Sequence, residues 1–209
     1  MGYVMKFGNV PIAESVGAIL AHKLYDSAGK LVFNKGHILQ KGDVDVLREQ
    51  GLQSVIVTQL SASDLHEDVA AERIGHAVAG QNIVMRAPGV GRANLTAAQR
   101  GILHVNVPAL ALINNIYDGI TIATLREYTL VDEREMVALV KIVPFGVPEA
   151  RVVDIEQVTR ATSSILRVEP LQEKQVALII SGTDATREQL MTRFSDAVRD
   201  RVVGWGSQL

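Results

Sequence analysis

The sequence predicts a mixed fold of α/β and β-rich parts (an α+β protein) that is made of three units. Residues 17–58 alternate strand and helix patterns, which predicts a small ββαβ unit within residues 1–63. Most segments between residues 81 and 147 have strand patterns, which predicts a β-rich unit over residues 64–148. Residues 149–209 end in a strand, a tight turn and a long helix, a pattern typical of the start of a doubly wound sheet.

The first unit is predicted to begin with a hairpin. The apolar segment Gly17–Leu24 and the segment Leu31–Phe33 are separated by Asp26–Gly29, whose residue types favour a turn. A helix is then predicted over Asp43–Gly51, with the aspartate as its N-cap. The β-branched residues of Ser54–Thr58 predict the last strand of the unit.

The second unit is expected to begin with a helix that Asp64 caps and that ends at Gly80. A short helix is also predicted around Pro108–Asn114, because a proline in the first turn of a helix costs no hydrogen bond. The rest of the unit is predicted as strands, over Ile83–Met85, Ile102–Val105, Ile120–Thr124 and Met136–Val143.

The third unit is marked off by two prolines at positions 144 and 148, and a connecting helix is predicted over Val152–Ser163. Nearly all residues of Gln175–Ile180 are apolar, which predicts a buried strand. The helix that follows is expected to end at Gly204 and to carry one apolar stripe, formed by Leu190, Phe194 and Val198.

The composition narrows the possible functions. The 209 residues have a net charge of −2 and only 4% aromatic side chains, which argues against nucleic acid as a partner. The absence of cysteine excludes disulfides, thiolate nucleophiles and cysteine-bound zinc. The longest apolar runs, such as Val107–Ile113, are far shorter than the roughly 18 residues that span a bilayer, and no signal peptide or anchor is evident. We therefore expect no membrane partner and a cytoplasmic protein.

One segment of this acidic chain is basic. Residues 73–117 contain four arginines and no acidic residue, and Gly89, Gly91, Arg92 and Asn94 form a loop inside this segment. Glycines let the backbone approach a ligand closely, and an arginine can form a two-pronged bond to phosphate or carboxylate. The sequence therefore predicts an anion-binding loop; the alternative is a surface loop whose glycines only make a turn.

A second candidate anion site is Ser181-Gly182-Thr183-Asp184, where the predicted strand meets the long helix. The free amides and the dipole at the N-terminus of a helix favour an anionic group. Thr183 or Asp184 could equally be an ordinary N-cap.

Two motifs that contain histidine have simpler structural explanations. Lys35-Gly36-His37 follows a predicted strand and has the residue types of an ordinary turn. His66-Glu67-Asp68 lacks the second histidine that a helical zinc site needs four residues later, because that position is Ala70. We therefore predict no metal site, and the residues identify no catalytic group.

Six short blocks occur in a familiar order over nearly the whole chain, at residues 16–22, 35–37, 66–71, 91–95, 123–125 and 141–144. In order and rough spacing they resemble the MoeA-like molybdopterin-binding proteins, relatives of the molybdotransferases that act late in molybdenum cofactor synthesis. The resemblance implies molybdopterin as a small-molecule pterin ligand, and a role in molybdenum cofactor biosynthesis or handling.

The resemblance also implies roles for the two candidate anion sites. Arg92 and the amides of Gly89 and Gly91 are expected to hold the phosphate of molybdopterin. Residues 181–184 correspond to a Thr-Gly-x-Glu-like turn that opens the pterin-binding domain of the family, here with Ser first and Asp last. The chain ends at Leu209, before the glycine-rich and acidic segments that complete the family's site, so we expect it to be the N-terminal portion of a longer protein.

The alternative function is a non-catalytic interaction or dimerisation module derived from that family. The apolar stripe of the C-terminal helix favours it, because one strand and one helix cannot cover such a stripe with a sheet. We therefore expect a homodimer in which residues 175–203 contribute to the interface.

Overall fold

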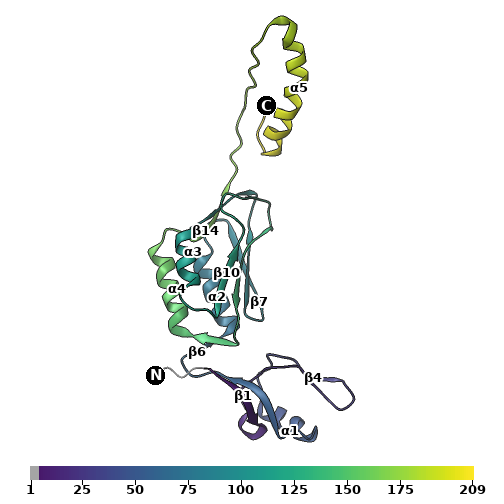
Figure 1. The fold of residues 1–209 in the computed structure, drawn as a ribbon, viewed down its shortest axis with the longest axis vertical. Coiled ribbons are helices and arrows are strands. Elements are labelled where there is room, and N and C mark those ends of the chain that lie inside the picture. Colours follow the sequence, from purple (N-terminus) through teal and green to yellow (C-terminus); the bar gives the residue numbers. More distant parts are fainter. Residues whose placement is uncertain (1–4) are drawn as a thin grey trace.

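The computed structural model describes residues 5–209, except for the side chain of Asp184, and arranges them as three parts along its long axis (Figure 1). An N-terminal unit, a central unit and a C-terminal tail follow one another. The described residues form five α-helices and many antiparallel strands in small sheets, which confirms the mixed α+β class.

The N-terminal unit is built on an antiparallel sheet with the strand order β1-β5-β2. Its own hydrophobic core includes the buried residues Leu20, Leu39, Leu47 and Val57. The elements of the unit are β1 (Lys6–Pro11), the 3-10 turn η1 (Ile12–Glu14), β2 (Ile19–Leu20), the hairpin of β3 (Leu24–Tyr25) and β4 (Leu31–Phe33), α1 (Lys41–Glu49) and β5 (Ser54–Gln59).

This unit differs from the predicted ββαβ arrangement at three places. The predicted strand Gly17–Leu24 is two short strands, β2 and β3, and only β3 pairs with β4, whereas β2 pairs with β5. The strand β1 was not predicted, because its sequence KFGNVP has no clear alternation and contains a glycine and a proline. Helix α1 begins before Asp43, so this residue lies in the first turn, where its carboxylate accepts a hydrogen bond from the Gln40 amide (2.8 Å). Asp43 thus stabilises the start of the helix from inside it.

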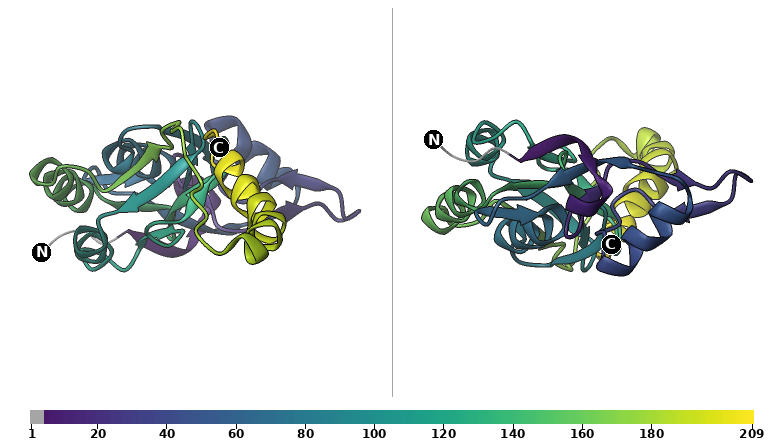
Figure 2. Two further views of the ribbon diagram at one scale, coloured as in Figure 1. Left: turned by 90° about the horizontal axis from the view of Figure 1, so that it is seen from above. Right: turned by 90° about the horizontal axis from the view of Figure 1, so that it is seen from below.

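The central unit packs two antiparallel sheets against three helices, which lie on the same side of the strands (Figure 2). The larger sheet has the order β10-β12-β8-β7, from Ile120–Thr124, Met136–Ile142, Arg92–Ala97 and Ile83–Gly89. The smaller sheet has the order β11-β9-β14, from Leu130–Val131, Gly101–Val105 and Leu166–Pro170. The helices are α2 (Glu67–Val78), α3 (Val107–Asn114) and α4 (Glu149–Ala161), and a short pair joins β6 (Asp64–His66) to β13 (Gly146–Pro148).

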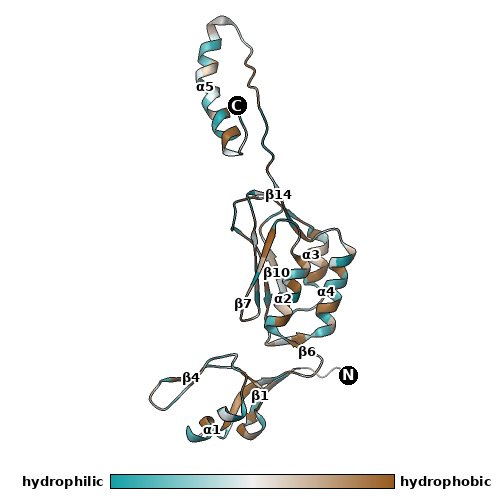
Figure 3. Cartoon of the chain, turned by 180° about the vertical axis from the view of Figure 1, so that it is seen from behind, coloured by the Kyte–Doolittle hydropathy of each residue, from teal (hydrophilic) through white to brown (hydrophobic). Residues whose placement is uncertain are grey.

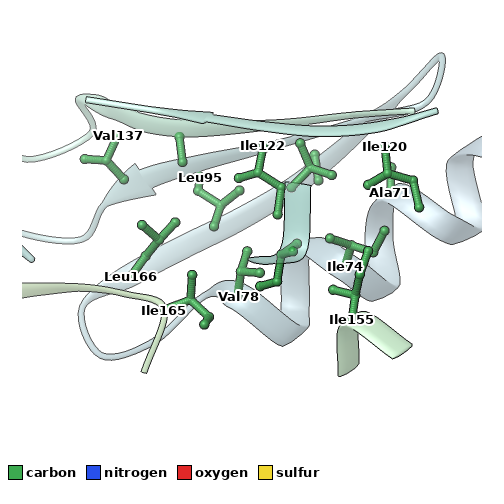
Figure 4. Packing of buried hydrophobic residues seen from close by; sticks show 14 of the residues in the cluster. Ala71, Ile74, Val78, Leu95, Ile120, Ile122, Val137, Ile155, Ile165 and Leu166 are labelled. Atoms are coloured by element: carbon green, nitrogen blue, oxygen red, sulfur yellow. The ribbon is translucent and has the colours of Figure 1, made fainter. Parts of the chain in front are cut away.

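The core of the central unit lies between the strands and these helices. Figure 4 shows Leu95, Ile122 and Val137 on the strand side and Ile74 and Val78 of α2 opposite them, all at most 3% exposed. The hydropathy colouring places hydrophobic residues on the strands and helices of this unit (Figure 3). Burial of apolar area is the main term that stabilises such a core.

The predicted boundary at residue 148 does not separate two cores. Helix α4 and strand β14 supply Val152, Ile155, Leu166 and Val168 to the core of the central unit, which therefore extends to the end of β14. Pro148 directly precedes α4, where a proline costs no helical hydrogen bond, so it begins a helix instead of marking a linker.

The C-terminal tail consists of an extended segment and helix α5 (Asp184–Gly204), which ends where the sequence predicts. The prediction of a buried strand over 175–180 is wrong. Within the described residues this segment pairs only through one bridge between Gln175 and Gln208, and Ile179 is 88% exposed. A strand needs a neighbour along its length, and only the few residues after α5 provide one. No helix in the described part of the chain, α5 included, is both long and apolar enough to cross a membrane.

Candidate functional site

The connection between β7 and β8 is a tight two-residue hairpin. Gly89 pairs with Arg92, and the two residues between them, Val90 and Gly91, have φ angles of 53° and 65°. Left-handed φ at both central positions is the pattern of a type I′ turn, which fits the twist of paired strands and favours Asn-Gly. A β-branched residue rarely adopts this conformation, so the backbone is strained at Val90, which is also 64% exposed.

Side chains from the first turn of α2 and from β12 hold this hairpin. The amide of Gly91 donates a hydrogen bond to Asp68 Oδ1 (2.7 Å), and Lys141 Nζ donates one to the carbonyl oxygen of Val90 (2.7 Å). The carboxylate of Glu67 lies 3.7 Å from Lys141 Nζ. Burial raises the pKa of the Glu67 carboxyl, because the charged form loses its hydration, although Lys141 acts in the opposite direction.

These contacts correct the role expected for the Gly91 amide. The amide is already bonded to a carboxylate, and the negative charge of Asp68 repels an anion that approaches the same place. Gly89 belongs to the β7–β8 ladder as the partner of Arg92. The two glycines therefore shape the hairpin, as in the alternative interpretation of this loop.

Arg92 and Asn94 alternate with buried residues of β8 and therefore lie on the sheet face away from the helices. The strand register places Arg86 of β7 opposite Asn94, and Lys141 of β12 opposite Arg92. Directly opposite residues of antiparallel strands lie on the same face. Arg86, Arg92, Asn94 and Lys141 thus share the outer face of the larger sheet, and we call these four residues the basic face.

The basic face has no acidic residue beside it on the sheet. The other outward positions of the four strands carry uncharged side chains, among them Val84, Thr96, Thr121, Ala123, Met136 and Leu139. Arg86 and Arg92 are exposed and form no ion pair within residues 5–209, whereas Lys141 is partly neutralised by Glu67. Two unpaired guanidinium groups on an open face are suited to a phosphate or a carboxylate.

Sequence reasoning missed two members of this face, Arg86 and Lys141. Alternation along each strand could have identified both as outward residues. Their position beside Arg92 depends on the register of the β7–β8 hairpin and on the pairing of β8 with β12, which lies about 40 residues later in the chain.

The second predicted anion site lies apart from the basic face. Ser181, Gly182 and Thr183 are exposed at the end of the extended segment, and Thr183 is the residue that precedes α5. Figure 1 shows this turn at the far end of the tail, so the fold does not bring the two predicted sites together. The side chain of Asp184 lies outside the described part of the chain.

The histidine motifs are accounted for by contacts within the protein. His66, not Asp64, is the N-cap of α2, and its Nδ1 accepts a hydrogen bond from the Asp68 amide (3.2 Å). Asp64 lies in β6, where the pairing with β13 keeps it out of the helix. His37 Nε2 contacts Asp43 Oδ2 (2.7 Å), and its ring stacks on Phe33. In the described residues, no group of three or more histidine or acidic side chains could hold a metal ion.

Comparison with known proteins bears on the N-terminal unit. Residues 9–59 match a family model described as a domain of unknown function (DUF8806). The match covers most of that unit and stops at the last residue of β5. No curated protein and no solved structure matches the chain.

Proposed function

We propose that the chain binds molybdopterin and serves in molybdenum cofactor biosynthesis or handling, with the phosphate of the ligand held on the basic face. The proposal is supported by the six sequence blocks that resemble the MoeA-like family, at residues 16–22, 35–37, 66–71, 91–95, 123–125 and 141–144. The observation that carries it is the arrangement of Arg86 and Arg92, two exposed guanidinium groups without an ion-pair partner in residues 5–209, around the amide of Asn94.

The chemistry of the basic face matches a phosphate monoester. Such a group carries between one and two negative charges near neutral pH and three acceptor oxygens. Each guanidinium can donate two parallel hydrogen bonds to these oxygens, and the Asn94 side chain adds a neutral donor. In this proposal Arg92 has the role that the resemblance implies. Ser181, Gly182, Thr183 and Asp184 lie apart from this face, so the pterin contacts that the resemblance implies for them are not part of the proposed phosphate site.

Calorimetry with molybdopterin that is prepared and handled without oxygen tests this proposal. Arg92→Ala is expected to weaken binding about tenfold or more, because a hydrogen bond to a charged group contributes about 1.5–3 kcal/mol. The melting temperature should stay nearly unchanged, since the side chain is exposed.

Arg100→Ala is the matched control. It removes an exposed arginine of the same basic segment, but one that is paired with Asp132 (3.2 Å) and lies outside the basic face. Equal affinities of the two variants and the unaltered protein would overturn the proposal.

A second candidate function is a non-catalytic interaction module that forms a homodimer through the tail. The observation that favours it is the exposure of large apolar side chains there, including Ile179, Met191, Phe194 and Trp205. Exposed apolar side chains gathered in one segment favour an interaction site, because covering them releases ordered water. The two functions differ in the residue whose substitution should impair them. This residue is Arg92 for ligand binding and Phe194 for association.

A further inference from the structure

A polar cavity lies in the central unit, apart from the basic face. It has a volume of about 350 Å³ and lies where the end of β9, the connection between β10 and β11 and the loop before β14 meet. This volume is at the lower end of the range for small-molecule sites. The lining side chains that can recognise a ligand are His104, Asn106, Glu127, Tyr128, Ser163 and Arg167.

One part of the cavity lining combines a guanidinium donor with an imidazole. Arg167 of β14 and His104 of β9 are direct partners in the strand register and lie on the same face of the smaller sheet. Glu169 Oε2 lies 3.2 Å from His104 Nε2 and 4.0 Å from Arg167 Nη2. Because Nε2 of the imidazole is turned to Glu169 and donates to it in the neutral ring, Nδ1 is left as an acceptor for an N–H or O–H group of a ligand. Arg167 has further N–H groups free, so this guanidinium suits an oxyanion.

The cavity also contains a carboxylate, that of Glu127. A simple anion is a poor match, because it would face this carboxylate without compensation. A ligand that carries an amine or a hydroxyl group as well can donate to Glu127. Asn106 adds a donor, since its Oδ1 already accepts a hydrogen bond from the Ala109 amide (3.1 Å) and its NH₂ group remains.

Tyr128 is held at the mouth of the cavity in a strained conformation. Its φ is 63°, its side chain is 67% exposed, and its ring packs edge-on against that of His104, with 5.5 Å between centroids. The Tyr128 amide donates to the carbonyl oxygen of Leu103 (2.8 Å), which fixes this conformation. Bulky residues rarely have positive φ, and such strain concentrates at ligand sites.

We propose that this cavity binds a small amino acid or hydroxy acid. Its carboxylate contacts Arg167, and its amine or hydroxyl group donates to Glu127 or to Nδ1 of His104. The ligand is thus recognised by two groups of opposite charge in the cavity lining, with the Tyr128 ring beside it.

Titration of the full chain, followed by the NMR shifts of its backbone amides, tests the proposal. The probes are L-serine, which has both ends, and acetate and ethanolamine, which have one end each. L-serine is expected to saturate the protein at the lowest concentration and to shift the amides of Asn106 and Tyr128, while that of Arg92 stays unchanged. Acetate binding as tightly as L-serine, shifts confined to other regions, or no saturable shift with any probe would each overturn the proposal.

Single substitutions test which cavity residue contacts each end of the ligand. Arg167→Gln and Glu127→Gln are each expected to weaken L-serine binding about tenfold or more. Arg151→Gln is the control, because it removes an exposed arginine that pairs with Asp154 (3.0 Å) on α4 and does not line this cavity. A loss in the control equal to that in the Arg167 variant, or unchanged binding in both cavity variants, contradicts the assignment. The amide spectrum of each variant shows whether it is folded.

Discussion

The carboxylate of Asp68 accepts a hydrogen bond from the amide of Gly91, which is 2.7 Å away and 23 residues later in the chain. The bond joins the first turn of α2 to the β7–β8 hairpin, and it is strong because its acceptor is charged. It directs the Gly91 amide toward the helix side of the sheet. Arg92, the next residue, belongs to the opposite face, which is why the basic face is built from side chains and not from the backbone of the loop.

The strain at Val90 predicts that an asparagine stabilises this hairpin. Val90→Asn is expected to raise the free energy of unfolding by about 1 kcal/mol, because asparagine tolerates the left-handed conformation that costs other residues roughly 1–2 kcal/mol. Urea unfolding measures the change. Val143→Asn is the control, since it replaces an equally exposed valine that has no positive φ. An equal gain in both variants would show that removing an exposed apolar side chain, not relief of strain, is responsible.

Gly91 is predicted to tolerate no side chain. A Cβ there would overlap Glu67 Oε2 and lie 2.9 Å from the carbonyl oxygen of Ile142. Gly91→Ala is therefore expected to lower the free energy of unfolding by on the order of 2–4 kcal/mol. Gly29→Ala separates the effect of backbone strain from that of crowding. Gly29 also has positive φ (78°), but no atom lies within 4 Å of its Cβ position. It should cost only about 1–2 kcal/mol; equal losses would mean that crowding by Glu67 has no effect.

The contact between α2 and α4 predicts a dependence of stability on pH. Arg73 Nε and Nη2 donate to the two carboxylate oxygens of Glu156 (2.8 and 3.0 Å), and these bonds lower the pKa of Glu156 from its ordinary value of 4.5. A carboxyl group whose pKa is lower in the folded protein adds stability above pH 4.5, and this stability is lost as the pH falls through the lowered pKa.

Glu156→Gln is therefore expected to lower the free energy of unfolding near neutral pH by about 1–2 kcal/mol. The difference from the unaltered protein should shrink as the pH falls below 4.5. Glu149→Gln is the comparison, since its contact with Arg73 Nη1 (2.7 Å) is about half exposed on the glutamate side and should contribute less than about 1 kcal/mol. A difference that stays constant with pH would exclude the ion pair as its cause.

The exposed tail predicts self-association. Light scattering at tens of micromolar is expected to show a dimer, and Phe194→Asp should dissociate it, because the new charge would lie unpaired in an apolar contact. Ala197→Asp, at another exposed position of α5, is the control for the added charge. A monomeric protein would refute the dimer, and a dimer that is insensitive to Phe194→Asp would place the interface outside the apolar side chains of the tail.

Local patterns by themselves determined the type of most elements. Strand β5, the β3–β4 hairpin, α3 and the end of α5 at Gly204 follow from β-branched runs, turn residues and helix stop signals, all of which act within a few residues. The sequence also located the basic segment around Arg92, since a stretch without acidic residues can be recognised without the fold.

Only the tertiary structure decided which segments are neighbours. The same local signals predicted a buried strand at 175–180, yet a strand exists only where another lies beside it, and the described chain provides a single bridge there. Strand pairing places Arg86 and Lys141 beside Arg92, and side-chain packing places α4 in the core of the central unit. Most of these contacts, such as that of Lys141 with Arg92, join residues far apart in the chain, so they depend on how whole surfaces bury one another and not on any local pattern.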